Sequence, residues 1–244
     1  MEMRRGCIVL ICVIGLALAG STSAGAAKRS SAKNSVTVQQ VVLRVNPCSI
    51  ESGTESGGPI WLPTQLTAQI PPALKSKVEL YSTGTNTVLA PAGWVCSALE
   101  ATDGGTSLVV SPPGQASSQA GASAPNSSNV TALFDYTGHG PGMDLVCPYF
   151  PPPDPQSYSG CSTSLPAGQT TKPITADILS ISTAPTAKQS RPSTGVLIYP
   201  KVRNYENTSV DIAEETCTLS TPSLCPTLLS DFAIRDFPIP VPSQ

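Results

Sequence analysis

The stretch CTLSTPSLCPTLLSDFA, residues 217–233, decides the fold class of this chain. It begins in the strand-like run 208–219, and its two cysteines, Cys217 and Cys225, enclose a short chain reversal. Four apolar residues then recur at helical spacing: Leu224, Leu228, Leu229 and Phe232. The proline at 226 lacks an amide for a continuing helix, so we expect a tight turn first and a regular helix over 226–233.

Upstream of this stretch the chain shows short strand patterns separated by Gly, Pro, Asn and Asp. They cover residues 36–45, 77–82, 87–90, 94–98, 106–111, 130–136, 174–178 and 195–199. The sequence Asp103-Gly104-Gly105 predicts a hairpin turn, and residues 71–75 predict a single helical turn. The sequence therefore predicts a β-rich α+β fold with one short C-terminal helix.

Cysteines outside the N-terminal region are spaced as in a disulfide framework. They are Cys48, Cys96, Cys147, Cys161, Cys217 and Cys225. Six cysteines allow many connectivities, and the provisional set is 48–96, 147–161 and 217–225. A zinc site is the rival interpretation, but the chain has no Cys-x-x-Cys pair and His139 is its only histidine. We therefore expect crosslinks, no metal and no cofactor.

The N-terminus is typical of an export signal. Basic residues precede the apolar run 7–19, and the small residues Ala24-Gly25-Ala26 offer a cleavage site. The run is shorter than the roughly 20 residues of a membrane span, so an uncleaved anchor is the weaker alternative. We expect a secreted, extracytoplasmic protein with no stable membrane span after processing.

The remaining chain is long enough for one domain. We assign 1–26 to the signal, 27–35 to a flexible lead-in, 36–236 to a single domain and 237–244 to a tail. Residues 111–128 read as a flexible low-complexity insertion. Only 12% of residues are charged and the net charge is −2, which argues against a nucleic-acid partner. An extracellular or cell-wall partner is expected instead.

Two motifs resemble landmarks of a known group of proteins. Residues 91–96 read Pro-x-Gly-Trp-x-Cys, and residues 147–151 read Cys-Pro-Tyr-Phe-Pro. Over about residues 70–235 the chain resembles uncharacterised secreted bacterial proteins of actinobacterial type. The resemblance implies export and disulfides, and it supplies no catalytic residues.

Enzyme signatures are weak. The segment around Ser56 (Glu-Ser-Gly-Gly-Pro) resembles the nucleophile segment of trypsin-like proteases, but His139 follows the serine instead of preceding it. A carboxylate pair can be drawn from several aspartates, and nothing in the sequence singles out two of them: Asp135, Asp144, Asp154, Asp177 and Asp211. We therefore predict a non-catalytic secreted or cell-envelope binding or structural module. The alternative is an extracellular hydrolase that uses a carboxylate pair or the His139 loop.

Four aromatic residues beside proline-rich turns form a candidate binding surface: Trp61, Tyr149, Phe150 and Tyr158. Covering the ends of a sheet is their alternative role. Trp94 shares a side of its strand with Cys96 and is expected to pack in the core over a disulfide, with sugar stacking as the alternative.

Overall fold

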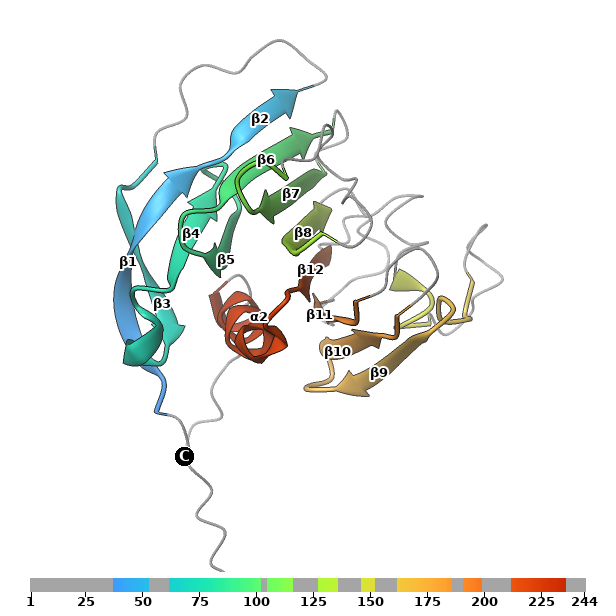
Figure 1. Ribbon diagram of the computed structural model, residues 1–244. Coiled ribbons are helices and arrows are strands. Elements are labelled where there is room, and N and C mark those ends of the chain that lie inside the picture. Colours follow the sequence, from blue (N-terminus) through green and yellow to red (C-terminus); the bar gives the residue numbers. More distant parts are fainter. Residues whose placement is uncertain are drawn as a thin grey trace, which may run out of the picture. The chain divides into compact units, whose positions relative to one another are not determined.

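The computed structural model describes eight segments of the chain (Figure 1). They are residues 37–52, 62–101, 105–115, 127–135, 146–151, 162–185, 191–198 and 212–235. All of them belong to one compact unit, Val36–Gln244. The predicted signal, lead-in and tail lie outside the described residues.

The described strands form two sheets (Figure 1). The four-stranded sheet has the order β3 (Gln65–Ile70), β1 (Gln39–Pro47), β4 (Val78–Ser82) and β5 (Thr87–Pro91). The eight-stranded sheet has the order β2 (Ser49–Ser52), β6 (Val95–Glu100), β7 (Thr106–Ser111), β8 (Asn129–Asp135), β12 (Ile212–Thr218), β11 (Ser193–Ile198), β10 (Ile178–Thr183) and β9 (Gln169–Pro173). Most neighbours are antiparallel; β1 with β4 and β2 with β6 are parallel.

One residue connects the two sheets along the chain. Cys48 lies between β1 and β2, so the chain passes from the four-stranded to the eight-stranded sheet at this point. Its backbone N–H donates to the Ser82 carbonyl in β4, and its sulfur is bonded to Cys96 in β6. The crossing is therefore held to both sheets at once.

The C-terminal helix α2 (Cys225–Arg235) contacts β3 and β5 of one sheet and β11 and β12 of the other. Leu228 and Phe232 are completely buried, and the Phe232 ring lies 5.6 Å from that of Phe134 in β8. The Asp231 carboxylate accepts a 2.7 Å hydrogen bond from the backbone N–H of Gln69 in β3. The helix thus fills the main core with its apolar face, as amphipathic helices do.

The predicted β-rich fold with one C-terminal helix is confirmed. A 3₁₀ turn at Pro222–Leu224 precedes α2, which begins one residue earlier than predicted. The single turn near residue 72 is also present, at Pro72–Leu74. The predicted hairpin is closed by a hydrogen bond from the Ala101 N–H to the Gly105 carbonyl.

The strand predicted over 174–178 is wrong. Residues 174–177 form the turn between β9 and β10, which begins at Ile178, and the N–H groups of Ile174 and Thr175 both donate to the Ile178 carbonyl. The Thr175 hydroxyl accepts from the Asp177 N–H and stabilises the reversal. Alternating isoleucines therefore marked the two sides of a turn and not one strand face.

Two of the predicted disulfides are confirmed within the described residues, Cys48–Cys96 and Cys217–Cys225. Cys147 is also disulfide-bonded, and its pairing with Cys161, which lies outside the described residues, stays a prediction. Such crosslinks indicate an oxidising, extracytoplasmic environment. Among the described helices, none has the length and apolar character that crossing a membrane requires.

The Pro-x-Gly-Trp-x-Cys motif forms the turn between β5 and β6. Gly93 has φ +75°, and its N–H donates to Glu79 Oε2 at 3.0 Å. The Tyr81 hydroxyl donates to the Pro91 carbonyl and accepts from the Trp94 N–H, both at 2.9 Å. Burial raises the pKa of Tyr81 to about 12, so the phenol keeps the proton that it donates. This motif is accounted for by turn geometry.

Candidate functional site

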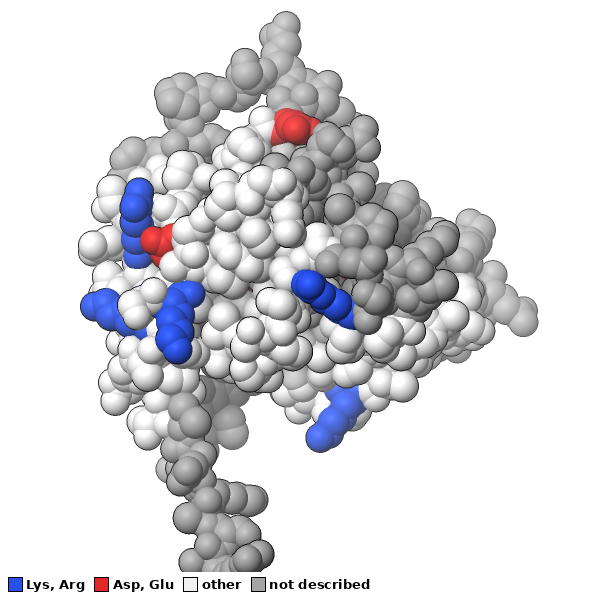
Figure 2. Space-filling model, viewed as in Figure 1, with Lys and Arg blue, Asp and Glu red and all other residues white. Residues whose placement is uncertain are grey.

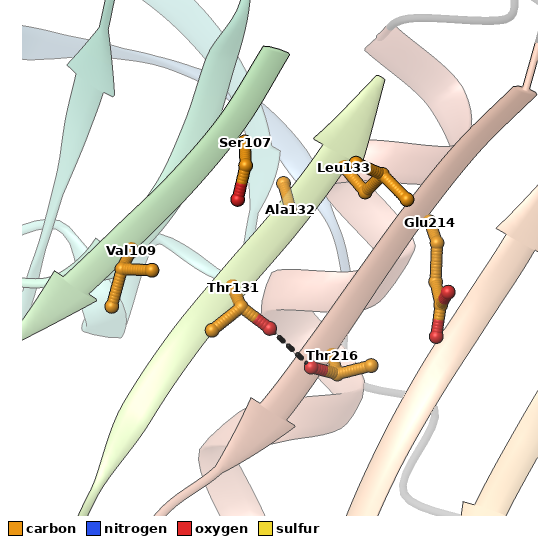
Figure 3. A pocket seen from close by; sticks show the side chains of 7 residues that line it. All are labelled: Ser107, Val109, Thr131, Ala132, Leu133, Glu214 and Thr216. Carbon is orange, nitrogen blue, oxygen red and sulfur yellow. Dashed lines mark hydrogen bonds between the residues drawn. The ribbon is translucent and has the colours of Figure 1, made fainter. Parts of the chain in front are cut away.

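A pocket of about 390 Å³ lies on the face of the eight-stranded sheet opposite α2 (Figure 3). We call it the hydroxyl groove. Strands β7, β8 and β12 form it, and its described lining is Ser107, Val109, Thr131, Ala132, Leu133, Glu214 and Thr216.

Strand alternation and register bring this lining together. On β8, Val130, Ala132 and Phe134 belong to the main core, so Thr131 and Leu133 face the opposite side of the sheet. Thr131 pairs with Thr216, and Leu133 with Glu214 on β12. The Thr131 and Thr216 hydroxyls are hydrogen-bonded to each other, as Figure 3 shows.

Ser107 completes the row on the other side of β8, where it pairs with Leu133. The groove floor therefore carries three hydroxyl groups, one carboxylate and apolar side chains from three strands. Such a surface can donate and accept several hydrogen bonds while desolvating the apolar part of a ligand.

Glu214 is the one ionisable side chain in the described lining. It is partly buried and lies between Leu133 on β8 and Leu197 on β11, its two register neighbours. Burial raises the pKa of its carboxyl above the ordinary value. Within the part of the chain that the structure describes, this carboxyl makes no hydrogen bond or ion pair. It therefore has acceptor capacity to offer a ligand.

The adjacent Glu215 cannot act with Glu214. Successive side chains of a strand point to opposite faces, and Glu215 pairs with Ala132 and Val196, which both belong to the main core. It is 0% exposed. Two carboxylates that are consecutive in sequence are thus separated by the sheet.

A second apolar cluster covers the neighbouring part of the same sheet face. It consists of Val146, Cys147, Ile181, Leu197 and Ile212, with Tyr149 and Phe150 packed against it. Burial raises the pKa of the Tyr149 phenol, and the negative charge of the nearby Glu214 carboxylate raises it further. The Tyr149 hydroxyl donates to the Gln169 side chain in β9. Tyr149 therefore packs near Glu214, on the cluster that includes Leu197, the register neighbour of Glu214.

Gly195 on β11 supports this arrangement from the other side of β12. It pairs with Thr216, and a Cβ at this position would lie 2.9 Å from the Glu215 carbonyl oxygen and 3.1 Å from Thr216 Cγ2. Only glycine allows the two strands to approach so closely here.

A second pocket, of about 320 Å³, lies beside the β5–β6 turn. Its described lining is Leu74, Lys77, Pro91, Trp94, Leu219, Ser220, Thr221, Ser223 and Leu224. Trp94 is partly buried and packs against the main core, which includes Cys96. Its indole thus contributes to the core and also borders a pocket.

Charged side chains are sparse on the face drawn in Figure 2.

No group of three or more His, Cys, Asp or Glu side chains that could hold a metal occurs among the described residues. The described lining of the hydroxyl groove has a single carboxylate, which is too few strong ligands for calcium or zinc.

The structure places only part of the predicted aromatic surface. Tyr149 and Phe150 are partly buried, and Tyr149 packs near Glu214. Trp61 and Tyr158 lie outside the described residues, so a surface shared by all four aromatics stays a prediction.

The predicted enzymatic candidates fall mostly outside the described segments as well. This holds for Ser56, His139 and three aspartates, Asp144, Asp154 and Asp211. Asp135 ends β8, and Asp177 lies in the β9–β10 turn. Neither belongs to the described lining of the groove.

Sequence reasoning missed the groove residues Ser107, Thr131, Glu214 and Thr216. The available signal was the polar side of the alternating segment at 130–136, where Thr131 falls between apolar residues. That signal does not reveal the partner strand, because β12 joins β8 from 85 residues away in sequence.

No family model, no curated protein and no solved structure matches this chain.

Proposed function

We propose that this protein is exported and acts as a non-catalytic binding module, with the hydroxyl groove as its ligand-binding surface. The disulfides support export, because they persist in oxidising compartments. The signal-like residues 1–26 and the resemblance to secreted bacterial proteins agree with this proposal.

One observation carries the non-catalytic part of the proposal. Glu214 is the single ionisable residue in the described lining, and Glu215 faces the main core on the other side of the sheet. Glycoside hydrolysis typically uses two carboxyl groups that flank the same bond, and the described lining holds one. One carboxylate among hydroxyls suits ligand binding instead.

The groove has the features of a small-ligand site. Its volume falls in the range of about 300–1,000 Å³ that is common for such sites. Strand backbones fix its floor, so little ordering entropy is lost when a ligand binds. A ligand of matching chemistry would carry several hydrogen-bonding groups on a small carbon skeleton.

Saturation-transfer NMR with a library of monosaccharides, short alcohols and amines tests this proposal. The Ser107→Phe variant adds an aromatic ring over the groove, and Val42→Phe is the matched control. Val42 is 51% exposed on β1, in the other sheet. We expect binding signals in the wild type and in Val42→Phe, their loss in Ser107→Phe, and recovery of every compound unchanged.

Two results would refute the proposal. Signals that persist undiminished in Ser107→Phe would place binding outside the groove. Hydrolysis of any glycoside, ester or peptide, abolished by Glu214→Gln, would establish the enzyme alternative.

A further inference from the structure

The charged and polar groups that line the groove indicate which charge its ligand should carry. The described lining offers the Glu214 carboxylate, three hydroxyls and apolar carbon, and it contains no lysine, arginine or histidine. A ligand with its own anionic group would meet Glu214 with no compensating cation among these residues. A neutral ligand would leave the carboxylate partly desolvated without a counter-charge.

We propose that the hydroxyl groove recognises a primary ammonium group, which binds Glu214 and donates its remaining hydrogens to neighbouring hydroxyls. This inference rests on the proposed function, because it names the ligand class of the same site.

The lining offers several acceptors for the donors of an ammonium group. Glu214 lines the pocket, and Thr131 and Thr216 form the next register pair on the same sheet face, two residues along each strand (Figure 3). The two threonine hydroxyls form one hydrogen bond between them, which leaves acceptor lone pairs on both oxygens. One carboxylate and two hydroxyl oxygens can therefore serve as acceptors for N–H groups.

The surroundings of Glu214 strengthen such a contact. Leu133 and Leu197 flank the carboxyl and partly exclude water, so a charge-assisted hydrogen bond is stronger here than on an open surface. Tyr149 is the titratable side chain that approaches from the 146–151 segment, and Glu215 is on the opposite face of the sheet. Among the described residues, no basic side chain competes for the carboxylate.

A metal ion is the other cation to consider. Calcium takes six to eight oxygen ligands and usually several carboxylates. The described lining offers one carboxylate and hydroxyls, and the hydroxyls are weak ligands. An organic cation that also fills the apolar part of the groove matches the lining better.

The test compares n-butylamine with n-butanol, which have the same skeleton and differ in charge. Amide shifts of Thr131, Glu214 and Thr216 in ¹H–¹⁵N spectra report the dissociation constants at pH 7 and low salt. We expect n-butylamine to bind about tenfold more tightly than n-butanol, because a charge-assisted contact replaces a neutral one.

Two variants test whether the preference for n-butylamine over n-butanol depends on Glu214. Glu214→Gln should abolish it, while Glu51→Gln, which removes one exposed carboxylate on β2, should retain it. A third measurement distinguishes direct binding of the cation to Glu214 from a purely structural role of this residue. Saturating n-butylamine should move the titration midpoint of the Glu214 carboxyl to lower pH, since a bound cation favours the carboxylate.

The outcomes separate this inference from the proposed function. Equal affinities for both probes, or a preference that survives in Glu214→Gln, would overturn the ammonium assignment and leave the groove as a binding site. Shifts at none of the groove amides with either probe would also overturn the ammonium assignment, and the absence of binding signals from the whole library would overturn the proposed function as well.

Discussion

Glu214 carries its carboxyl on a sheet face between two leucines, where the charged form is less favourable than in the unfolded chain. Its pKa is therefore raised on folding. A carboxyl with a raised folded pKa contributes full stability below its unfolded pKa, near 4.5, and that contribution is lost as the pH rises through the folded pKa.

Replacing Glu214 by Gln should therefore raise the urea midpoint of unfolding at pH 7 relative to the wild type. The difference should shrink as the pH falls towards 4, where the wild-type carboxyl is protonated as well. Glu51→Gln, at an exposed position of β2, is the control. A lower midpoint for Glu214→Gln at pH 7 would show that the carboxylate has a stabilising partner.

Gly195 is a second residue at which a small substitution should change the stability of the protein. Gly195→Ala should destabilise the protein by about 1–3 kcal/mol, because the new Cβ would press on the Glu215 carbonyl and the Thr216 methyl. Urea unfolding measures the effect, and Thr194→Ala, at the exposed neighbouring position, is the control. Equal stabilities of the Gly195 and Thr194 variants would mean that the strands separate freely at this point.

At the scale of the elements, a partly buried hydrogen bond joins α2 to the four-stranded sheet. Asp231 is 1% exposed and accepts from the Gln69 N–H in β3. Asp231→Ala should cost about 1–3 kcal/mol, since it leaves a backbone donor without this acceptor. Denaturant unfolding should show the loss, and Ser230→Ala, at an exposed position of the same helix, should show almost none.

The two described disulfides constrain loops of very different length. Cys48 and Cys96 are separated by 48 residues, and Cys217 and Cys225 by 8. In the chain-entropy model, removing the longer crosslink with paired serine substitutions should cost about 1.5 kcal/mol more than removing the shorter one. Calorimetry of the two double variants tests this order, which would be reversed if native packing and not chain entropy dominated.

The elements also show which strands a sequence reveals. Strand β8 was found because one of its faces is buried, which imposes a strict apolar alternation. Strand β9, with the sequence Gln-Thr-Thr-Lys-Pro, lies at a sheet edge with mostly exposed side chains, so it has no such pattern. Strand β3 likewise mixes exposed and buried positions and was missed. Burial of one face, and not strand formation itself, produced the readable signal.

For the whole molecule, the sequence predicted the β-rich class, the C-terminal helix and the crosslinks Cys48–Cys96 and Cys217–Cys225. The site required more, because the groove depends on β8 lying between β7 and β12. In the register that pairs Thr131 with Thr216, both strands also bury their other face in the main core. No local pattern in the sequence contains that pairing.

At this scale the functional account depends on where small molecules bind to the oxidised protein. Mapping amide shifts with the library of alcohols, amines and monosaccharides tests this directly. The account predicts that the largest shifts occur at Ser107, Thr131, Glu214 and Thr216 and that each compound is recovered intact. Shifts confined to residues outside the hydroxyl groove, or chemical conversion of a compound, would contradict it.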